Sequence, residues 1–170
     1  MHLVESNSIL ALFNGVCFWA AVCSWMAAQF TKMLCGYVRT RRVDFSYLVS
    51  TGGMPSAHSA MVCGLATAVG LVSGFDSSVF AVALAFATVT MFDASTVRHA
   101  AGLQARLLNE MVDELFKEHH LSERKLAEFL GHTRLEVFMG LVIGVLTALL
   151  VTAAWVLWVA PVTVGASLAL

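Results

Sequence analysis

Long uncharged runs constrain this 170-residue chain more than any other feature. No Asp, Glu, Lys or Arg occurs in residues 6–31, 45–75, 77–92 or 137–170. Only 12% of the residues are charged, whereas an ordinary soluble domain has about 25%. A soluble globule of this size could not cover its surface with so few charges, so we expect the chain to lie in a membrane. Its composition is also too apolar for a disordered chain.

Four stretches are candidate membrane spans, since a helix needs roughly 20 apolar residues to cross the hydrocarbon core. They are approximately 9–30, 57–75, 77–97 and 135–160. The third ends near Asp93 or continues to Val97. The first lacks the basic flank of a signal peptide, so we expect it to be retained. These spans predict an all-α fold, a polytopic helical membrane bundle that forms a single domain over residues 1–170.

The charged segment between the third and fourth spans has a helical pattern of its own. Apolar residues recur at helical spacing through residues 100–118, with charged and polar residues between them. The pattern predicts an amphipathic helix that lies on the bilayer surface or caps the bundle. A shorter helix is predicted at 123–130, between Ser122 as N-cap and Gly131 as its end.

All 10 cations lie in two segments, residues 31–55 and 98–136. With four spans, both segments fall on one side of the membrane, and the positive-inside rule places that side in the cytoplasm. The chain is then expected in the inner or cytoplasmic membrane, with both termini facing outward. The net charge of −1 gives no electrostatic argument for binding nucleic acid, so no such partner is expected.

The first polar motif is the glycine-rich turn at residues 51–56, which leads into a helix with His58 in its first turn. Free backbone N–H groups at such a helix start favour an anion. In the plainer interpretation, the motif is only a tight loop that enters a span. A histidine at the top of a span, beside a basic segment, favours a functional role instead.

Lys32 and Arg39 form the second motif. They are seven residues apart, so on a helix that continues beyond the bilayer they share one face and can bind one ligand. In the alternative interpretation these cations anchor the helix at anionic lipid head groups. For the neighbouring Arg41 and Arg42, the anchor is the better interpretation.

The third motif precedes the last span, where His132 and Glu136 are four residues apart. On a helix this carboxylate can accept the imidazole N–H and leave the other ring nitrogen nucleophilic. A competing interpretation is a capping box, in which Thr133 and Glu136 cap the last helix. On sequence grounds, Glu136 cannot serve both arrangements fully.

Together the motifs resemble the type-2 phosphatidic acid phosphatase and vanadium haloperoxidase superfamily. The resemblance rests on Lys32 with Arg39, on Pro55-Ser56-Ala57-His58, and on His132 with an acid four residues later. Four stretches look more specifically like its divergent branch of small integral membrane proteins, namely residues 51–60, 92–98, 101–105 and 131–140. The resemblance covers roughly residues 29–150.

This resemblance implies hydrolysis of a phosphomonoester through a phosphohistidine, with no metal and no cofactor. His132 would attack phosphorus, Glu136 would orient it, and His58 would protonate the leaving alkoxide and then activate water. Fixed cations and N–H donors suit a transition state whose charge spreads over the phosphoryl oxygens. The expected phosphate-binding residues are Lys32, Arg39, Arg98, Gly53 and Ser56, with Asp93 and Arg134 in support.

The chain departs from the superfamily pattern in several places. The mild departures are Thr40 where Pro is expected, Ala57 where Gly is usual, and Glu136 where Asp is expected. The larger one is a missing Ser-Arg pair before the nucleophile, where Lys125 and Leu126 stand.

We expect Arg98 to supply the missing cation, because it follows the third span on the same predicted face of the membrane. Arg134 is the weaker alternative. Asp93 would pair with Arg98 or position a histidine, and its plainer interpretation is a charge at a helix end.

The leading hypothesis is therefore a membrane-embedded lipid phosphatase whose site faces the cytoplasm. Phosphatidate, phosphatidylglycerophosphate and polyprenyl phosphates all fit as substrates. The expected partners are the membrane lipid substrate and the bilayer, and the sequence is also compatible with a homo-oligomer. The alternative is a non-catalytic membrane protein that retains the site to bind lipid phosphate. Vanadate-dependent halide oxidation and transport fit less well.

Overall fold

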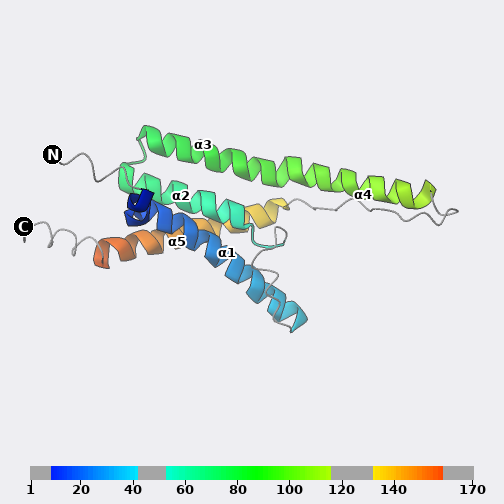
Figure 1. Ribbon diagram of the computed structural model, residues 1–170, viewed down its shortest axis with the longest axis horizontal. Helices are drawn as coiled ribbons and strands as arrows, with labels where there is room; N and C mark the ends of the chain where they lie inside the picture. Colours follow the sequence, from blue (N-terminus) through cyan, green and yellow to red (C-terminus); the bar gives the residue numbers. More distant parts are fainter. Residues whose placement is uncertain (1–8, 42–52, 116–131, 159–170) are drawn as a thin grey trace, which may run out of the picture.

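A computed structural model shows an all-α helical bundle and describes residues 9–41, 53–115 and 132–158 (Figure 1). In chain order the elements are the 3-10 helix η2 (Ile9–Asn14), α1 (Val16–Thr40), α2 (Ala57–Ser73), α3 (Ser78–Phe92), the π-helical turn η4 (Asp93–Val97), α4 (Arg98–Leu115) and α5 (Arg134–Trp158). The described part of the chain contains no strand. The predicted all-α class is therefore confirmed.

Two helical runs are long and apolar enough to cross a membrane, namely Ser78–Val112, which joins α3, η4 and most of α4, and α5. The α2 helix is apolar but has only 17 residues. The α1 helix buries three polar side chains, those of Ser24, Gln29 and Lys32. These helices suit the membrane bundle that the composition predicts, and the four-span topology stays a prediction.

The first predicted span differs from the helix that forms. Residues 9–30 divide at Gly15, where η2 gives way to α1. The α1 helix then continues past residue 30 to Thr40, and Arg41 in a left-handed conformation (φ 57°) ends it. The Arg41 N–H donates to the carbonyl oxygen of Tyr37 at 2.7 Å. Lys32 and Arg39 therefore lie on one continuous helix, as their spacing requires.

The third predicted span and the amphipathic helix form one rod rather than two separate helices (Figure 1). The π-helical turn η4 joins them, and α4 begins at Arg98 instead of residue 100. The α2 and α5 helices lie close to the second and fourth predicted spans. The helix predicted at 123–130 lies outside the described residues.

Serine caps fix where α2 and α3 begin. Ser56 Oγ accepts the Ser59 N–H at 3.4 Å, and Ser77 Oγ accepts the Phe80 N–H at 3.2 Å. Gly74 ends α2 with φ 89°, a conformation that glycine adopts without strain. The short turn between the helices makes them antiparallel, so the end of α3 lies level with the start of α2 (Figure 1).

Small residues at four-residue intervals line the contacts among α1, α2 and α5. This small-residue seam comprises Ala20, Ser24 and Ala28 on α1, Ala60, Gly64 and Ala68 on α2, and Gly140, Gly144 and Ala148 on α5, all of them buried. A four-residue interval keeps side chains on one face of a helix. Small side chains on such faces let helices in a membrane approach closely.

Backbone contacts across the seam leave no room for larger side chains. A Cβ atom on Gly144 would overlap the carbonyl oxygen of Ala60, and one on Gly64 would overlap the Ser24 hydroxyl. Ser24 Oγ also donates to the Gly144 carbonyl oxygen at 3.2 Å, which links α1 to α5. Each of the three helices therefore touches the other two, while α3 packs on the outside against α2.

Large apolar side chains lie on the outside of this bundle. They include Val82, Val89 and Phe92 of the α3 helix and Leu150 and Leu157 of α5, each more than 60% exposed. In a soluble protein such residues would fill the core. A small-residue interior with large apolar residues outside is the arrangement that a lipid environment favours, since lipid does not drive large side chains inward.

Replacing Gly144 by Ala tests the seam. Alanine is the better helix former, which would stabilise an isolated helix by up to about 1 kcal/mol. Here the added methyl meets the backbone of Ala60, so we expect a net loss of about 1–3 kcal/mol in the free energy of unfolding in detergent. The control is Ala154→Val, which enlarges an exposed residue of the same helix. Equal stability of the two variants would contradict the close packing.

Candidate functional site

The small-residue seam ends in a cluster of polar residues at one end of the bundle. One more four-residue step along α1 leads to Lys32, one along α2 leads to Ser56 at its N-cap, and one along α5 leads to Glu136. The start of α2, the start of α5 and the later part of α1 lie at the same end of the bundle (Figure 1). Helix packing therefore gathers three of the residues that the sequence analysis selected.

His132 and Glu136 form a hydrogen-bonded pair. His132 lies just before α5, and its Nδ1 is 3.1 Å from Glu136 Oε2. A carboxylate only accepts, so the imidazole donates its Nδ1–H and keeps the lone pair on Nε2. The side chains are 7% and 20% exposed. The contact that the four-residue spacing predicts is present.

The same carboxylate oxygen also caps α5. The Thr133 N–H donates to Glu136 Oε2 at 2.9 Å, and the Glu136 N–H donates to Thr133 Oγ1 at 3.3 Å. These two bonds form a capping box. Treating the two uses of Glu136 as exclusive was wrong, because one carboxylate oxygen has lone pairs enough to accept from both His132 and Thr133.

The described end of the glycine-rich turn, residues 53–56, is held against the first turn of α5. The Ser56 N–H donates to the carbonyl oxygen of Glu136 at 3.0 Å. A Cβ atom on Gly140 would overlap the Ser56 carbonyl oxygen and lie 2.9 Å from Ser59 Cβ. Glycine at position 140 is therefore what lets the turn lie on α5.

Ser56 is better described as an anchor than as the phosphate ligand that we predicted. Its side chain is completely buried, and its Oγ is bonded to the N–H and to the hydroxyl of Ser59, the latter at 3.1 Å. Its own N–H is taken by Glu136. The polar groups of Ser56 thus hold the turn together within the protein.

Lys32 brings a buried cation to the cluster. It is 3% exposed, and a Cβ atom on Gly53 would lie 3.9 Å from the Cδ and Cγ atoms of the Lys32 side chain. Gly53 itself has φ 88°, where a side chain would be strained. Burial lowers the pKa of the Lys32 ammonium, and the charge of Glu136 acts in the opposite direction. Lys32, the glycine-rich turn and Glu136 are therefore neighbours.

Two more predicted residues lie on the same helices. His58 is exposed in the first turn of α2, two residues after the Ser56 anchor. Arg39 lies two helical turns beyond Lys32, in the last turn of α1. Their positions put both residues at the polar end of the bundle.

The other predicted residues lie farther along the chain. Asp93 is half-buried and opens η4, which contacts α3, α4 and α5. Arg98 is the first residue of α4, directly after η4. Arg134 is exposed in the first turn of α5. The described residues contain no group of three His, Cys, Asp or Glu side chains that could hold a metal.

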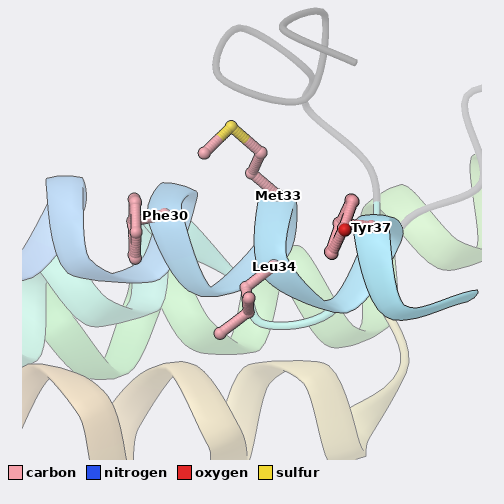
Figure 2. A pocket seen from close by; sticks show the side chains of 4 residues that line it. All are labelled: Phe30, Met33, Leu34 and Tyr37. Carbon is pink, nitrogen blue, oxygen red and sulfur yellow. The ribbon is translucent and has the colours of Figure 1, made fainter. Parts of the chain in front are cut away.

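An apolar groove on α1 is separate from this cluster. Phe30, Met33, Leu34 and Tyr37 line it (Figure 2). Phe30, Leu34 and Tyr37 are 60%, 51% and 41% exposed, whereas Lys32 in the same stretch is buried. The groove therefore lies on the outer face of α1, and the polar cluster lies against its inner face.

Gln29 is a polar residue that the sequence analysis did not select. It is 5% exposed and precedes Lys32 by three residues, so the two share the inner side of α1. Its carboxamide within an otherwise apolar run was the sequence feature that could have identified it. The sequence also did not predict that Ser56 would lie against Gly140 and bond to Glu136. The small residues at intervals of four were the feature that could have indicated this close packing.

Comparison with known proteins gives a family and a relative. The model of the Divergent PAP2 family matches residues 13–147. The uncharacterized membrane protein YuiD of Bacillus subtilis (strain 168) is 42% identical over 160 residues, which is 88% of this chain and 96% of that protein. No solved structure matches significantly.

A double-mutant cycle tests whether Lys32 and Glu136 interact in the folded protein. We expect Lys32→Met and Glu136→Gln each to lower the free energy of unfolding, and the double variant to lose less than the sum. The expected coupling is about 0.5–3 kcal/mol. The exposed Arg106–Glu110 ion pair, 3.0 Å between Nε and Oε1, serves as the control and should couple by only about 0.3–0.5 kcal/mol. A Lys32–Glu136 coupling no larger than that of this control would refute the electrostatic interaction.

Proposed function

The chain belongs to the Divergent PAP2 family, and from this premise we propose that it is a membrane phosphatase that hydrolyses a lipid phosphomonoester through a phosphohistidine. The observation that carries the proposal is the hydrogen bond from His132 Nδ1 to Glu136 Oε2, which directs the lone pair to Nε2. The buried ammonium of Lys32 lies near that carboxylate. A nucleophile with an orienting base partner and a fixed cation suits phosphoryl transfer.

In the first step, His132 Nε2 attacks phosphorus and forms a P–N bond. The bond between phosphorus and the ester oxygen breaks, and the alkoxide leaves with a proton from His58. Glu136 stabilises the imidazole as positive charge develops on it, in the way that a buried carboxylate assists a catalytic histidine.

In the second step, His58 removes a proton from water as the water oxygen attacks phosphorus. The P–N bond breaks, inorganic phosphate leaves, and His132 returns to its starting form. The exposure of His58 supports this role, because the leaving alcohol and the incoming water must both reach its ring.

Fixed positive charge would stabilise the transferring phosphoryl group. Lys32 supplies it from α1, and Arg39 and Arg98 are proposed to add theirs. The helix starts of α2 and α5 are tied together by the bond from Ser56 to Glu136. The positive ends of two helix dipoles therefore meet at the site, and such ends favour phosphate.

A lipid substrate follows from the site's place at the end of an apolar bundle. A phosphate head group would lie among the cations while its acyl or prenyl chains stay in the bilayer. Phosphatidate, phosphatidylglycerophosphate and polyprenyl phosphates share this chemistry. We propose a cytoplasmic orientation for the site, on the charge distribution of the chain.

A binding protein without turnover is the second candidate. Lys125 and Leu126 in place of the superfamily's Ser-Arg pair favour it. Such a protein would bind lipid phosphate and release none, so an assay of phosphate release separates the two functions.

Phosphate release from a panel of lipid phosphates tests the enzyme. We expect turnover by the detergent-purified chain with EDTA present, and losses of at least a hundredfold in His132→Ala and His58→Ala, since acid–base catalysis alone contributes about 10²–10⁴-fold. His120→Ala is the matched control. Equal low release by wild type and all three variants would refute the enzyme and leave the binding protein, which lipid-phosphate binding would then detect.

The arginine variants test the proposed replacement for the missing pair. Arg98→Ala should lose most of the turnover, because one fixed cation at a phosphoryl group stabilises the transition state by several kcal/mol, about 10²-fold or more. Arg134→Ala should stay close to wild type, and Arg106→Ala is the control for an exposed arginine. If instead Arg134→Ala loses most of the turnover and Arg98→Ala stays close to wild type, Arg134 supplies the missing cation.

A further inference from the structure

Thr133 has no role in the mechanism above, yet it shares the acceptor atom of the catalytic pair. Glu136 Oε2 receives the Nδ1–H of His132 at 3.1 Å and the backbone N–H of Thr133 at 2.9 Å. Both donors come from the residues immediately before α5. A carboxylate that accepts two converging bonds on one oxygen has little freedom to rotate.

The Thr133 hydroxyl closes the arrangement from the other side. Its Oγ1 accepts the Glu136 N–H at 3.3 Å, and the Thr133 carbonyl oxygen accepts the first helical bond of α5, from Val137 N–H, at 3.1 Å. The backbone and the side chain of Glu136 are therefore both tied to Thr133. A change in the first turn of α5 would move Oε2 away from His132.

Thr133 itself is exposed, so packing does not explain its contacts. An ordinary N-cap requires only one bond from the hydroxyl to a helix N–H. Here the reciprocal bond ends on the oxygen that also holds the histidine. The cap and the histidine pair are one hydrogen-bonded unit.

We propose that Thr133 is a positioning residue, whose capping box holds the Glu136 carboxylate against His132 and so keeps His132 in its Nδ1–H form. This role rests on the proposed function, because the Nδ1–H form matters for turnover only if Nε2 is the nucleophile. Loss of the hydroxyl would free the first turn of α5. The imidazole would then exchange between its two neutral forms, and only one of them presents a nucleophilic Nε2.

Thr133→Val removes the hydroxyl and keeps the shape of the side chain. For this variant we expect a kcat about fivefold to tenfold lower with KM unchanged, a size that follows from the usual cost of losing an N-cap. Thr133→Ser should restore wild-type turnover. Thr88→Val, which removes an exposed hydroxyl bonded to the Leu84 carbonyl oxygen, is the matched control.

The direct readout is the proton position on His132, from nitrogen NMR of the full chain in detergent with labelled histidine. Wild type and Thr133→Ser should show the Nδ1–H form, and Thr133→Val should show a mixture of both forms. Glu136→Gln gives the reference spectrum for loss of the carboxylate. Wild-type spectra and kcat in Thr133→Val would overturn the proposal.

A replacement variant and a comparison with His132→Ala keep the outcomes distinct. If Thr133→Val does not fold, Thr133→Gly replaces it, because glycine at an N-cap costs the helix only a few tenths of a kcal/mol and also lacks the hydroxyl. If wild type and His132→Ala release phosphate equally, the proposed function fails. The spectra then still decide whether Thr133 holds the histidine.

Discussion

The close approach of α2 and α5 is the constraint on which the rest of the structure depends. Glycine at positions 140 and 144 lets the two backbones touch, where any side chain would overlap Ser56 or Ala60. Only at this distance can the Ser56 N–H reach the carbonyl oxygen of Glu136. The packing that holds the bundle together therefore also sets which polar groups face one another at its end.

Glu136 joins the fold to the proposed chemistry. Its carbonyl oxygen holds the glycine-rich turn, its carboxylate caps α5 and contacts His132, and its charge acts on the buried Lys32. Such interactions are strong where water is scarce, because the effective dielectric constant is low. The carboxylate of Glu136 therefore serves two purposes at once. It caps α5 in the fold, and it holds His132 in the proposed reaction.

The spacing of residues along the chain predicted much of this structure, but it did not predict the contacts between helices. The all-α class followed from uncharged runs, and the contact of His132 with Glu136 was predicted from their four-residue spacing, although His132 lies just before α5 rather than on it. The clamp from Ser56 to Glu136 could not be predicted in the same way, because it depends on how α2 docks on α5. Nor did the composition show that η4 would join two predicted helices into one rod. The small residues at four-residue intervals were the sequence feature that indicated where the helices pack closely.

Trapping the covalent intermediate tests the account most directly. The full chain in detergent would be mixed with a lipid phosphate and quenched in alkali, which preserves a phosphorus–nitrogen bond, and its peptides would be analysed by mass spectrometry. The proposed mechanism predicts one added phosphoryl group on His132 and none on His58, and the loss of that group as water completes the turnover. A phosphoryl group on any other residue, or turnover with no phosphorylated histidine at any time, would contradict it.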